Sequence, residues 1–396
     1  MAITKAQKLS DIKQACDPRP LRRDELQEYF VDTSNARDPV VSRRDELSQQ
    51  LRQRVDRPAS ILLAGHTGCG KSTELVKLAD DLSSKFMTVT FSIAQEASLF
   101  HVPVEDVLVV AMERLLDACQ TAGMEGDLSG AEDTLREIHQ WFASELELTE
   151  TQIEAGGEAG AGVDASGGVL GQLLGVLVQA KAYIKRADSR VHRMAHEKPQ
   201  RLSALARCCD LLVKDVQDAL QKRGRRLLLI IEDLDKLSLK DSRDIFLKQP
   251  GILAELGCSL ICTVSTFLLH SPDKQALEQH FSVVELPMIC IADRQGVPQD
   301  KGEGAVRDIV TRRVDEGLVE SKAMSTLIQK TGGVLRDVFE VLVIAGGAAE
   351  SLHRRGEQDA SITTDNIRYA LNRRRIEYKR AISSIDLPQE WQITAE

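Results

Sequence analysis

The sequence predicts an α/β protein built on a parallel sheet, with a large helical insertion and an all-helical C-terminal part. Three observations carry this. An apolar run over 60–64 leads into Gly65-His66-Thr67-Gly68-Cys69-Gly70-Lys71-Ser72, and a helical pattern follows over 73–79. A second apolar run, 227–231, leads into three acids, Glu232, Asp233 and Asp235, and such a continuous run is typical of a strand buried on both faces of a parallel sheet. From residue 296 onward the apolar spacing is helical.

Composition limits the class of protein. The chain has 396 residues, 42% hydrophobic and 28% charged, which suits a globular protein of two or three domains. A net charge of -9 argues against a dedicated nucleic-acid binder. Neither a secretory signal nor a run of about eighteen apolar residues is found, so we expect a cytoplasmic protein with no transmembrane segment. The eight cysteines lack C-x₂-C spacing, which favours reduced thiols over a zinc site.

The glycine-rich segment after the first strand has the spacing of a phosphate-binding loop. Glycines allow positive φ and leave the backbone amides open to an anion at the start of a helix. Lys71 would reach the β- and γ-phosphates, and the Ser72 hydroxyl would coordinate Mg²⁺. We therefore expect a nucleoside triphosphate with its metal. The candidate cofactor-binding residues are Gly65, His66, Thr67, Gly68, Cys69, Gly70, Lys71, Ser72 and Thr73.

Residues 1–57 form a polar lead-in, with helical patterns over 22–29 and 44–54. Tyr29, Phe30 or Val31 would cover an adenine ring, or the segment is a surface helix; the sequence leaves both open. The next strand is expected over 86–93, where β-branched residues alternate.

The long stretch 95–224 is interpreted as a mostly helical insertion, because it greatly exceeds an ordinary crossover. Helices are expected over 104–122, 131–148 and 201–223. The Gly/Ala-rich run 154–162 is typical of a hinge. A leucine stripe over 169–178 indicates a helix that contacts a partner or a membrane, or one that is buried in its own domain.

The acids after 227–231 should lie beyond the carboxyl end of their strand, where ligands of parallel sheets bind. We assign Glu232 to the magnesium ion and Asp233 to the attacking water, with the opposite assignment left open. Further strands are expected over 259–266 and 281–287. Helices are expected over 303–316, 320–330, 334–354 and 364–384.

The segments 64–75 and 231–236 resemble those of AAA+/STAND (KAP-like) bacterial P-loop ATPases. The resemblance covers 58–93 and 226–345. It implies a five-stranded parallel sheet of order 5-1-4-3-2 and a C-terminal all-helical lid. The family usually shows Asp before Glu, whereas Glu232 precedes Asp233 here. That reversal leaves the identity of the catalytic base open and points to slow hydrolysis.

The resemblance also implies residues that sense the γ-phosphate. At the end of the fourth strand Ser265 is favoured over Thr263 and Thr266, with strand-end capping as the alternative. Near the start of a lid helix, Arg336 is the second candidate, or else a surface arginine. An arginine finger acting on a neighbouring subunit would come from Arg243, Arg294, Arg312 or Arg313. The arginines of the last helix either hold a phosphate backbone or form a solvated face.

These observations divide the chain into five segments: a lead-in (1–57), two core parts (58–94 and 225–295), the insertion between them (95–224) and the lid (296–396). We expect a switch that binds Mg·ATP, hydrolyses it, and changes conformation or forms a homo-oligomer to control a separate effector protein, in bacterial antiviral defence. A DNA-loading or nucleic-acid-remodelling ATPase and a non-hydrolysing scaffold are the alternatives; nucleic acid is the less favoured partner.

Overall fold

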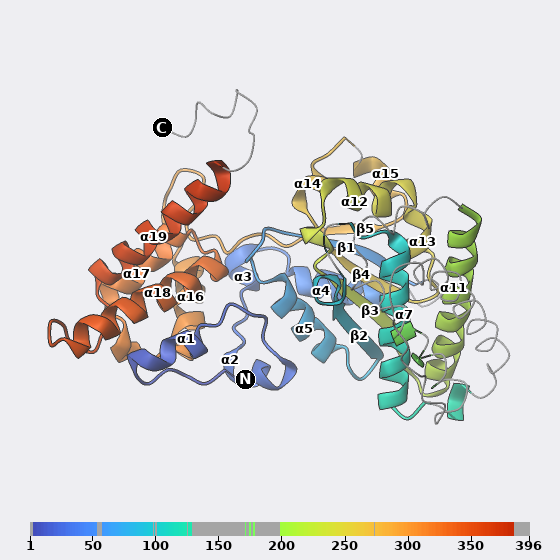
Figure 1. Cartoon of the computed structure of the whole chain (residues 1–396), viewed down its shortest axis with the longest axis horizontal. Coiled ribbons are helices and arrows are strands. Elements are labelled where there is room, and N and C mark those ends of the chain that lie inside the picture. The colour runs from blue at the N-terminus through green and yellow to red at the C-terminus, as the bar shows by residue number, and fades with distance from the viewer. Residues whose placement is uncertain are drawn as a thin grey trace, which may run out of the picture. The chain divides into compact units, whose positions relative to one another are not determined.

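The computed structural model describes residues 3–53, 58–97, 99, 101–124, 126–128, 171, 174, 175, 177, 178, 199–272 and 274–383. The chain forms two compact units. Figure 1 shows the chain coloured by residue number. The first comprises Met1–Ser42, His66–Lys77 and Leu286–Glu396, and the second Arg43–Gly65 and Leu78–Glu285. Among the described residues no helix is long and apolar enough to cross a membrane.

The second unit is built on a five-stranded parallel sheet. Its order is β2-β3-β4-β1-β5, which confirms the predicted order 5-1-4-3-2 and the predicted fold class. The pairings β1 with β4, β1 with β5, β2 with β3 and β3 with β4 are all parallel. The strands are β1 (Ser60–Ala64), β2 (Phe86–Ser92), β3 (Arg226–Glu232), β4 (Ser259–Val264) and β5 (Ser282–Glu285).

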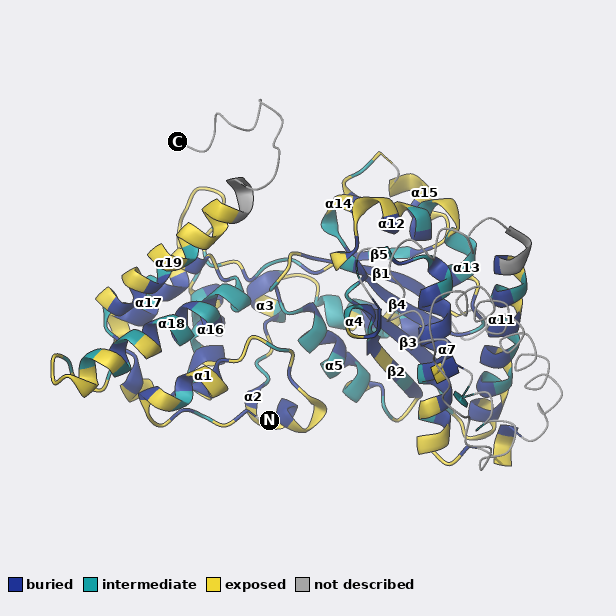
Figure 2. Cartoon of the chain, in the orientation of Figure 1, coloured by how far each residue is buried: buried dark blue, intermediate teal, exposed yellow. Residues whose placement is uncertain are grey.

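The strand register brings the carboxyl ends of β1, β3 and β4 to one edge of the sheet. Cys262 of β4 pairs with Leu62 of β1 on one side and with Ile231 of β3 on the other. Every residue of β1 and β4 is buried, as Figure 2 shows in dark blue, because helices cover both faces. The sheet therefore places the start of the glycine-rich loop and the acids after β3 at the same edge.

The insertion between β2 and β3 is helical where it is described. Its long helices α7 (Val104–Thr121) and α11 (Pro199–Lys222) pack into the core that also contains the sheet. Leu177 is buried and Leu174 packs against the same core, so these two leucines of the stripe belong to their own unit. The expected helix 131–148, the hinge 154–162 and the remaining leucines of the stripe lie outside the described residues.

Short elements complete the second unit. They connect the strands or flank the sheet (Figure 1). They are α4 (Arg43–Gln53), α6 (Ile93–Glu96), the 3₁₀ turn η4 (Leu234–Lys236), α12 (Leu239–Arg243), the π-helical turn η5 (Asp244–Lys248), α13 (Pro250–Ala254), α14 (Thr266–Leu269) and α15 (Lys274–Glu278).

The first unit is helical, apart from the loop segment and irregular connections. Its helices are α1 (Ile12–Ala15), α2 (Leu26–Tyr29), α3 (Ser34–Arg37), the start of α5 (Lys71–Asp81), α16 (Asp300–Arg313), α17 (Ser321–Thr331), α18 (Leu335–Arg354) and α19 (Thr364–Ser383), with 3₁₀ turns η1 (Leu9–Asp11), η2 (Arg23–Glu25) and η6 (Glu316–Leu318).

Helix α18 organises the core of this unit. Val338, Leu342 and Ala345 repeat at helical spacing and are fully buried. On the same helix, a Cβ at Gly346 would lie only 3.1 Å from Ile12, so the glycine lets α1 approach closely. The N-terminal residues and the C-terminal helices therefore fold as one cluster.

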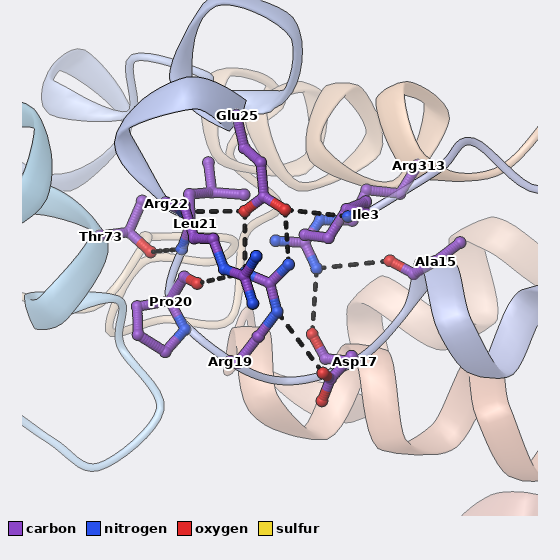
Figure 3. Close-up of polar contacts among 10 residues, drawn as sticks. All are labelled: Ile3, Ala15, Asp17, Arg19, Pro20, Leu21, Arg22, Glu25, Thr73 and Arg313. Atoms are coloured by element: carbon purple, nitrogen blue, oxygen red, sulfur yellow. Dashed lines mark hydrogen bonds and ion pairs between the residues drawn. The ribbon is translucent and has the colours of Figure 1, made fainter. Parts of the chain in front are cut away.

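The lead-in segment is fixed by an ion-pair network, shown in Figure 3. The buried Glu25 carboxylate accepts hydrogen bonds from Arg19 Nη1 at 2.8 Å and from the Ile3 amide at 2.8 Å. The hydrogen bond from Arg19 lowers the pKa of Glu25 to about 2, against the opposing effect of burial. Tyr29 packs with Ile3 in a small apolar cluster, so its ring already has a structural role.

We predict that Glu25 makes the first unit sensitive to acid. Because the pKa of the folded-state carboxyl is depressed to about 2, its stabilisation is complete above the unfolded pKa of about 4.3 and is lost as pH falls toward 2. Wild-type protein should lose roughly 2–3 kcal/mol more between pH 7 and pH 2.5 than Glu25→Gln does. Urea unfolding at both pH values measures this. The exposed neighbour substitution Asp24→Asn should leave the wild-type pH dependence intact; equal pH dependence in Glu25→Gln would contradict the prediction.

Candidate functional site

The glycine-rich loop has the backbone shape of an anion-binding site. Gly68 and Gly70 have φ of 81° and 101°, a region that side chains disfavour. The Cys69 amide bonds to the His66 carbonyl at 3.2 Å, and the Glu74 amide bonds to the Gly70 carbonyl at 3.1 Å. Helix α5 begins at Lys71 and runs for 11 residues, so the loop amides precede the positive end of a helix.

Two side chains near the end of the loop have partners within the first unit. Lys71 is only 7% exposed, and its Nζ donates to the His66 carbonyl at 3.2 Å. Thr73 Oγ1 accepts a bond from the Leu21 amide at 3.4 Å, which ties the lead-in segment to α5 (Figure 3). The assignments of Lys71, Ser72 and Thr73 to a nucleotide stay predictions.

Arg37, at the end of α3, is the residue that the sequence analysis missed. Its Nη2 donates to the Cys69 carbonyl at 2.6 Å and its Nη1 to the Pro287 carbonyl at 2.6 Å. Its Nε donates to Thr33 Oγ1 at 2.8 Å. The guanidinium is buried, and burial lowers the pKa of Arg37 while the nearby Glu74 carboxylate opposes that shift.

These contacts give Arg37 a clear physical effect. By binding the Cys69 carbonyl, the guanidinium fixes the orientation of the peptide in the middle of the loop. Because the Arg37 guanidinium holds the Cys69 carbonyl oxygen, that oxygen is kept away from an anion bound by the loop amides. No motif marks this residue, because it precedes the loop by a whole strand and helix and acts through tertiary contact.

The first turn of α18 also packs against the loop. A Cβ at Gly68 would lie 2.7 Å from the Cβ of Arg336 and 3.3 Å from Val334 Cγ1. Arg336 is therefore brought beside the loop by the fold. Its predicted role as a γ-phosphate sensor stays a prediction.

The acids of the second unit lie at the end of β3. Glu232 is the last residue of the strand and is 9% exposed. Asp233 has φ of 68°, and it is the one non-glycine residue with positive φ among those described. Its carboxylate accepts a bond from Ser92 Oγ at 2.5 Å and pairs with Lys236 Nζ at 2.7 Å. The carboxylate predicted to act on water is thus already partnered by a hydroxyl and an ammonium group.

The hydroxyls at the end of β4 have local partners. Ser265 Oγ accepts a bond from the Phe267 amide at 3.3 Å and caps α14, the alternative that the sequence left open. Thr263 is fully buried and donates to Asp235 Oδ1 at 3.2 Å. Thr266 is the first residue of α14. The sensor role of Ser265 stays a prediction.

One candidate arginine finger is wrong. Arg313 is only 4% exposed, and its Nη1 donates to the Asp17 carbonyl at 3.2 Å while its guanidinium stacks on Phe339 at 4.2 Å. A buried side chain cannot reach another subunit. Arg312 donates to the Glu28 carbonyl at 3.0 Å but is exposed, as are Arg243 and Arg294.

The fold therefore gathers the predicted residues into two sets. The first unit holds the loop from His66 to Thr73 with Arg37 and Arg336, and the second holds Glu232, Asp233 and the β4 hydroxyls. In the described ranges no cluster of three or more His, Cys, Asp or Glu side chains is arranged to hold a metal ion. Mg²⁺ is commonly bound through one or two carboxylates, water and substrate phosphates, and Glu232 and Asp233 supply two carboxylates at the end of β3.

Comparison with known proteins gives no family. No protein-family model matches the chain, and no curated protein matches it. Among solved structures, the Orc1 protein of Aeropyrum pernix in complex with DNA is similar with 14% identity and a TM-score of 0.39, over 88% of this chain and 68% of that chain. Cdc6p of Pyrobaculum aerophilum is similar with 13% identity and a TM-score of 0.39, over 86% and 70%. At these TM-scores neither structure says what this chain does.

We predict that Gly68 is required by the packing of α18 as well as by its backbone conformation. Gly68→Ala combines positive-φ strain with a 2.7 Å approach to Arg336 Cβ, and should cost roughly 2–4 kcal/mol of stability without nucleotide. Gly332→Ala is the matched control, because Gly332 has φ of +63° and nothing within 4 Å of an added Cβ; it should cost about 1 kcal/mol. Urea unfolding compares the two. Equal losses would show that the contact with α18 does not matter.

Proposed function

We propose that this protein is an ATP-binding and ATP-hydrolysing switch of the AAA+ class. The observation that carries the proposal is the order β2-β3-β4-β1-β5, in which β1 runs into a loop with positive-φ Gly68 and Gly70 at the start of α5. Successive amides at a helix N-terminus suit the phosphates of a nucleotide. Lys71 would bind the β- and γ-phosphates, and Ser72 would bind Mg²⁺.

The acids after β3 supply the chemistry in this proposal. Glu232 would hold the magnesium ion through its water shell, and Asp233 would orient and deprotonate the attacking water. The Asp233 carboxylate is already bound by Lys236 at 2.7 Å and by the Ser92 hydroxyl at 2.5 Å, so an attacking water would have to compete with these partners. Slow turnover is the expected result.

The switch itself would act through the helical C-terminal part. The first turn of α18 packs on Gly68, so a phosphate that moves the loop also acts on α18 through Arg336. In this proposal the cytoplasmic protein changes conformation or forms a homo-oligomer on binding ATP and so controls a separate effector, in the setting of bacterial antiviral defence. The domain boundaries at 57, 94, 224 and 295 remain part of the proposal.

Two alternatives are distinguished by simple measurements. A DNA-loading or nucleic-acid-remodelling ATPase requires ATP turnover that DNA stimulates. Absence of DNA binding at low salt excludes this alternative. A scaffold that binds nucleotide without hydrolysis requires biological activity to survive a Glu232/Asp233 double substitution. The switch requires that activity to be lost.

We predict that Lys71 and Glu232 separate binding from hydrolysis. Lys71→Ala should weaken Mg·ATP binding at least about tenfold, because an ammonium–phosphate contact is charge-assisted. Glu232→Gln should retain ATP binding and lose most hydrolysis. Calorimetric titration with ATP and a phosphate-release assay measure the two effects. Wild-type protein that takes up no ATP would end the proposal, and unchanged turnover in Glu232→Gln would move the catalytic role elsewhere.

We predict that Arg37 positions the loop for nucleotide. Arg37→Lys keeps the charge but cannot reach Cys69, Pro287 and Thr33 together, so ATP affinity should fall by roughly tenfold. Arg225→Lys is the matched control, since this half-buried arginine donates to the Phe86 carbonyl at 2.9 Å and has no contact with the loop among those described. Calorimetric titration with ATP, under conditions in which each variant is folded, provides the comparison. Equal affinities in the two variants would contradict the assignment.

A further inference from the structure

Helix α19 exposes a face of unusual composition along most of its length. The helix spans Thr364–Ser383 and carries six basic residues against two acidic ones, in a chain of net charge -9. Its inner side packs on the first unit through Ile367 and Ala370, which are fully buried. Its other side lies open, as Figure 2 shows in yellow.

Most of the exposed residues fall into three rows at helical spacing; Glu377 and Tyr378 are also exposed but lie outside these rows. A central row begins at the exposed Asp365 and continues through Tyr369, Asn372 and Ile376, with Tyr369 and Ile376 more than half exposed at 55% and 51%. One flank contains Arg368, Arg375 and Lys379, and the other contains Arg373 and Arg380; all are exposed, and Arg368 pairs with Asp365 at 3.1 Å. From Tyr369 to Ile376 an apolar and amide strip thus runs between two basic rows.

The remaining arginine of the helix shows that the basic residues have different roles. Arg374 pairs with Asp337 at 3.1 Å and also with Glu340, both on α18, and it stacks on Tyr378 at 4.9 Å. That side chain holds α19 to its neighbour. Arg373, Arg375 and Lys379 point to solvent and are placed to meet an anion outside the protein.

We propose that this face of α19 binds duplex DNA, with the helix lying in the major groove. An α-helix is about 10–12 Å across and the groove is about 12 Å wide, so two basic rows on opposite flanks meet the two phosphate backbones. The central row then faces the base edges, where Asn372 has the groups that recognise adenine and Ile376 suits a thymine methyl. The inference does not depend on ATP chemistry.

Other occupants fit the face less well. Single-strand platforms stack successive bases on several aromatic rings, whereas Tyr369 is the one aromatic in the central row. A partner helix would need apolar anchors at each turn, but the middle position is Asn372. A lipid surface would need a broad apolar face, and here two apolar side chains lie between five charges.

The test measures binding of the full chain, without ATP, to a fluorescently labelled duplex of about 20 base pairs by fluorescence anisotropy. If Arg373, Arg375, Lys379 and Arg380 each contact a phosphate, affinity should fall roughly 100-fold between 50 and 200 mM NaCl. Arg373→Glu/Lys379→Glu should weaken binding at 50 mM NaCl by at least about tenfold. The matched control is Lys322→Glu/Lys330→Glu, which makes the same charge change at two exposed lysines of α17 and should alter affinity by less than about threefold.

Each outcome decides the proposal. Absence of duplex binding at 50 mM NaCl overturns it, as does equal weakening in the two double variants. Tighter binding to the single strand than to the duplex also overturns the proposal, because the face would then bind single-stranded DNA. Competition by polyglutamate that equals competition by unlabelled duplex overturns it too, because the face would then bind any polyanion. Arg375→Gln/Lys379→Gln provides a milder second variant if the first fails to fold. Lys71→Ala should bind the duplex like wild type, so loss of ATP binding and loss of DNA binding are separate results.

Discussion

The first unit depends on the guanidinium group of Arg37. It is buried, and it joins the end of α3, the middle of the glycine-rich loop and the segment that follows β5. Burial of a charge is costly unless its donors are bound, and here three carbonyl or hydroxyl oxygens bind them. This one side chain therefore joins the loop to two other segments of its own unit.

The second unit depends on a different constraint, the packing of a sheet that is covered on both faces. The strands place the residues after β1, β3 and β4 at one edge, and the local chemistry then refines each position. Asp233 adopts a left-handed backbone while Ser92 and Lys236 hold its carboxylate. Such strain persists only where neighbouring contacts fix it, and it is concentrated at functional sites.

Much of the fold follows from sequence, because its signals are local. The strands and the C-terminal helices lie within a few residues of their predicted positions, since alternation and helical spacing are properties of short segments. Arg37 and the contact between Gly68 and Arg336 could not be found this way. The contact of Arg37 with Cys69 and the contact of Gly68 with Arg336 each join residues that are far apart in the chain. Nothing in the local sequence around either arginine marks these contacts. Arg313 failed as an exposed candidate for the same reason: only the fold shows that Phe339 covers it.

The close approach of Gly68 to the Cβ of Arg336 also limits how this protein can be recombined. Glycine-rich loops of this spacing look interchangeable between sequences, because their work is done by the backbone. Here the loop and the beginning of α18 are shaped to each other, so a chimera that imports one segment without the other brings together surfaces that are not complementary in shape. Transplanting the two segments as a pair is the sound way to exchange either of them.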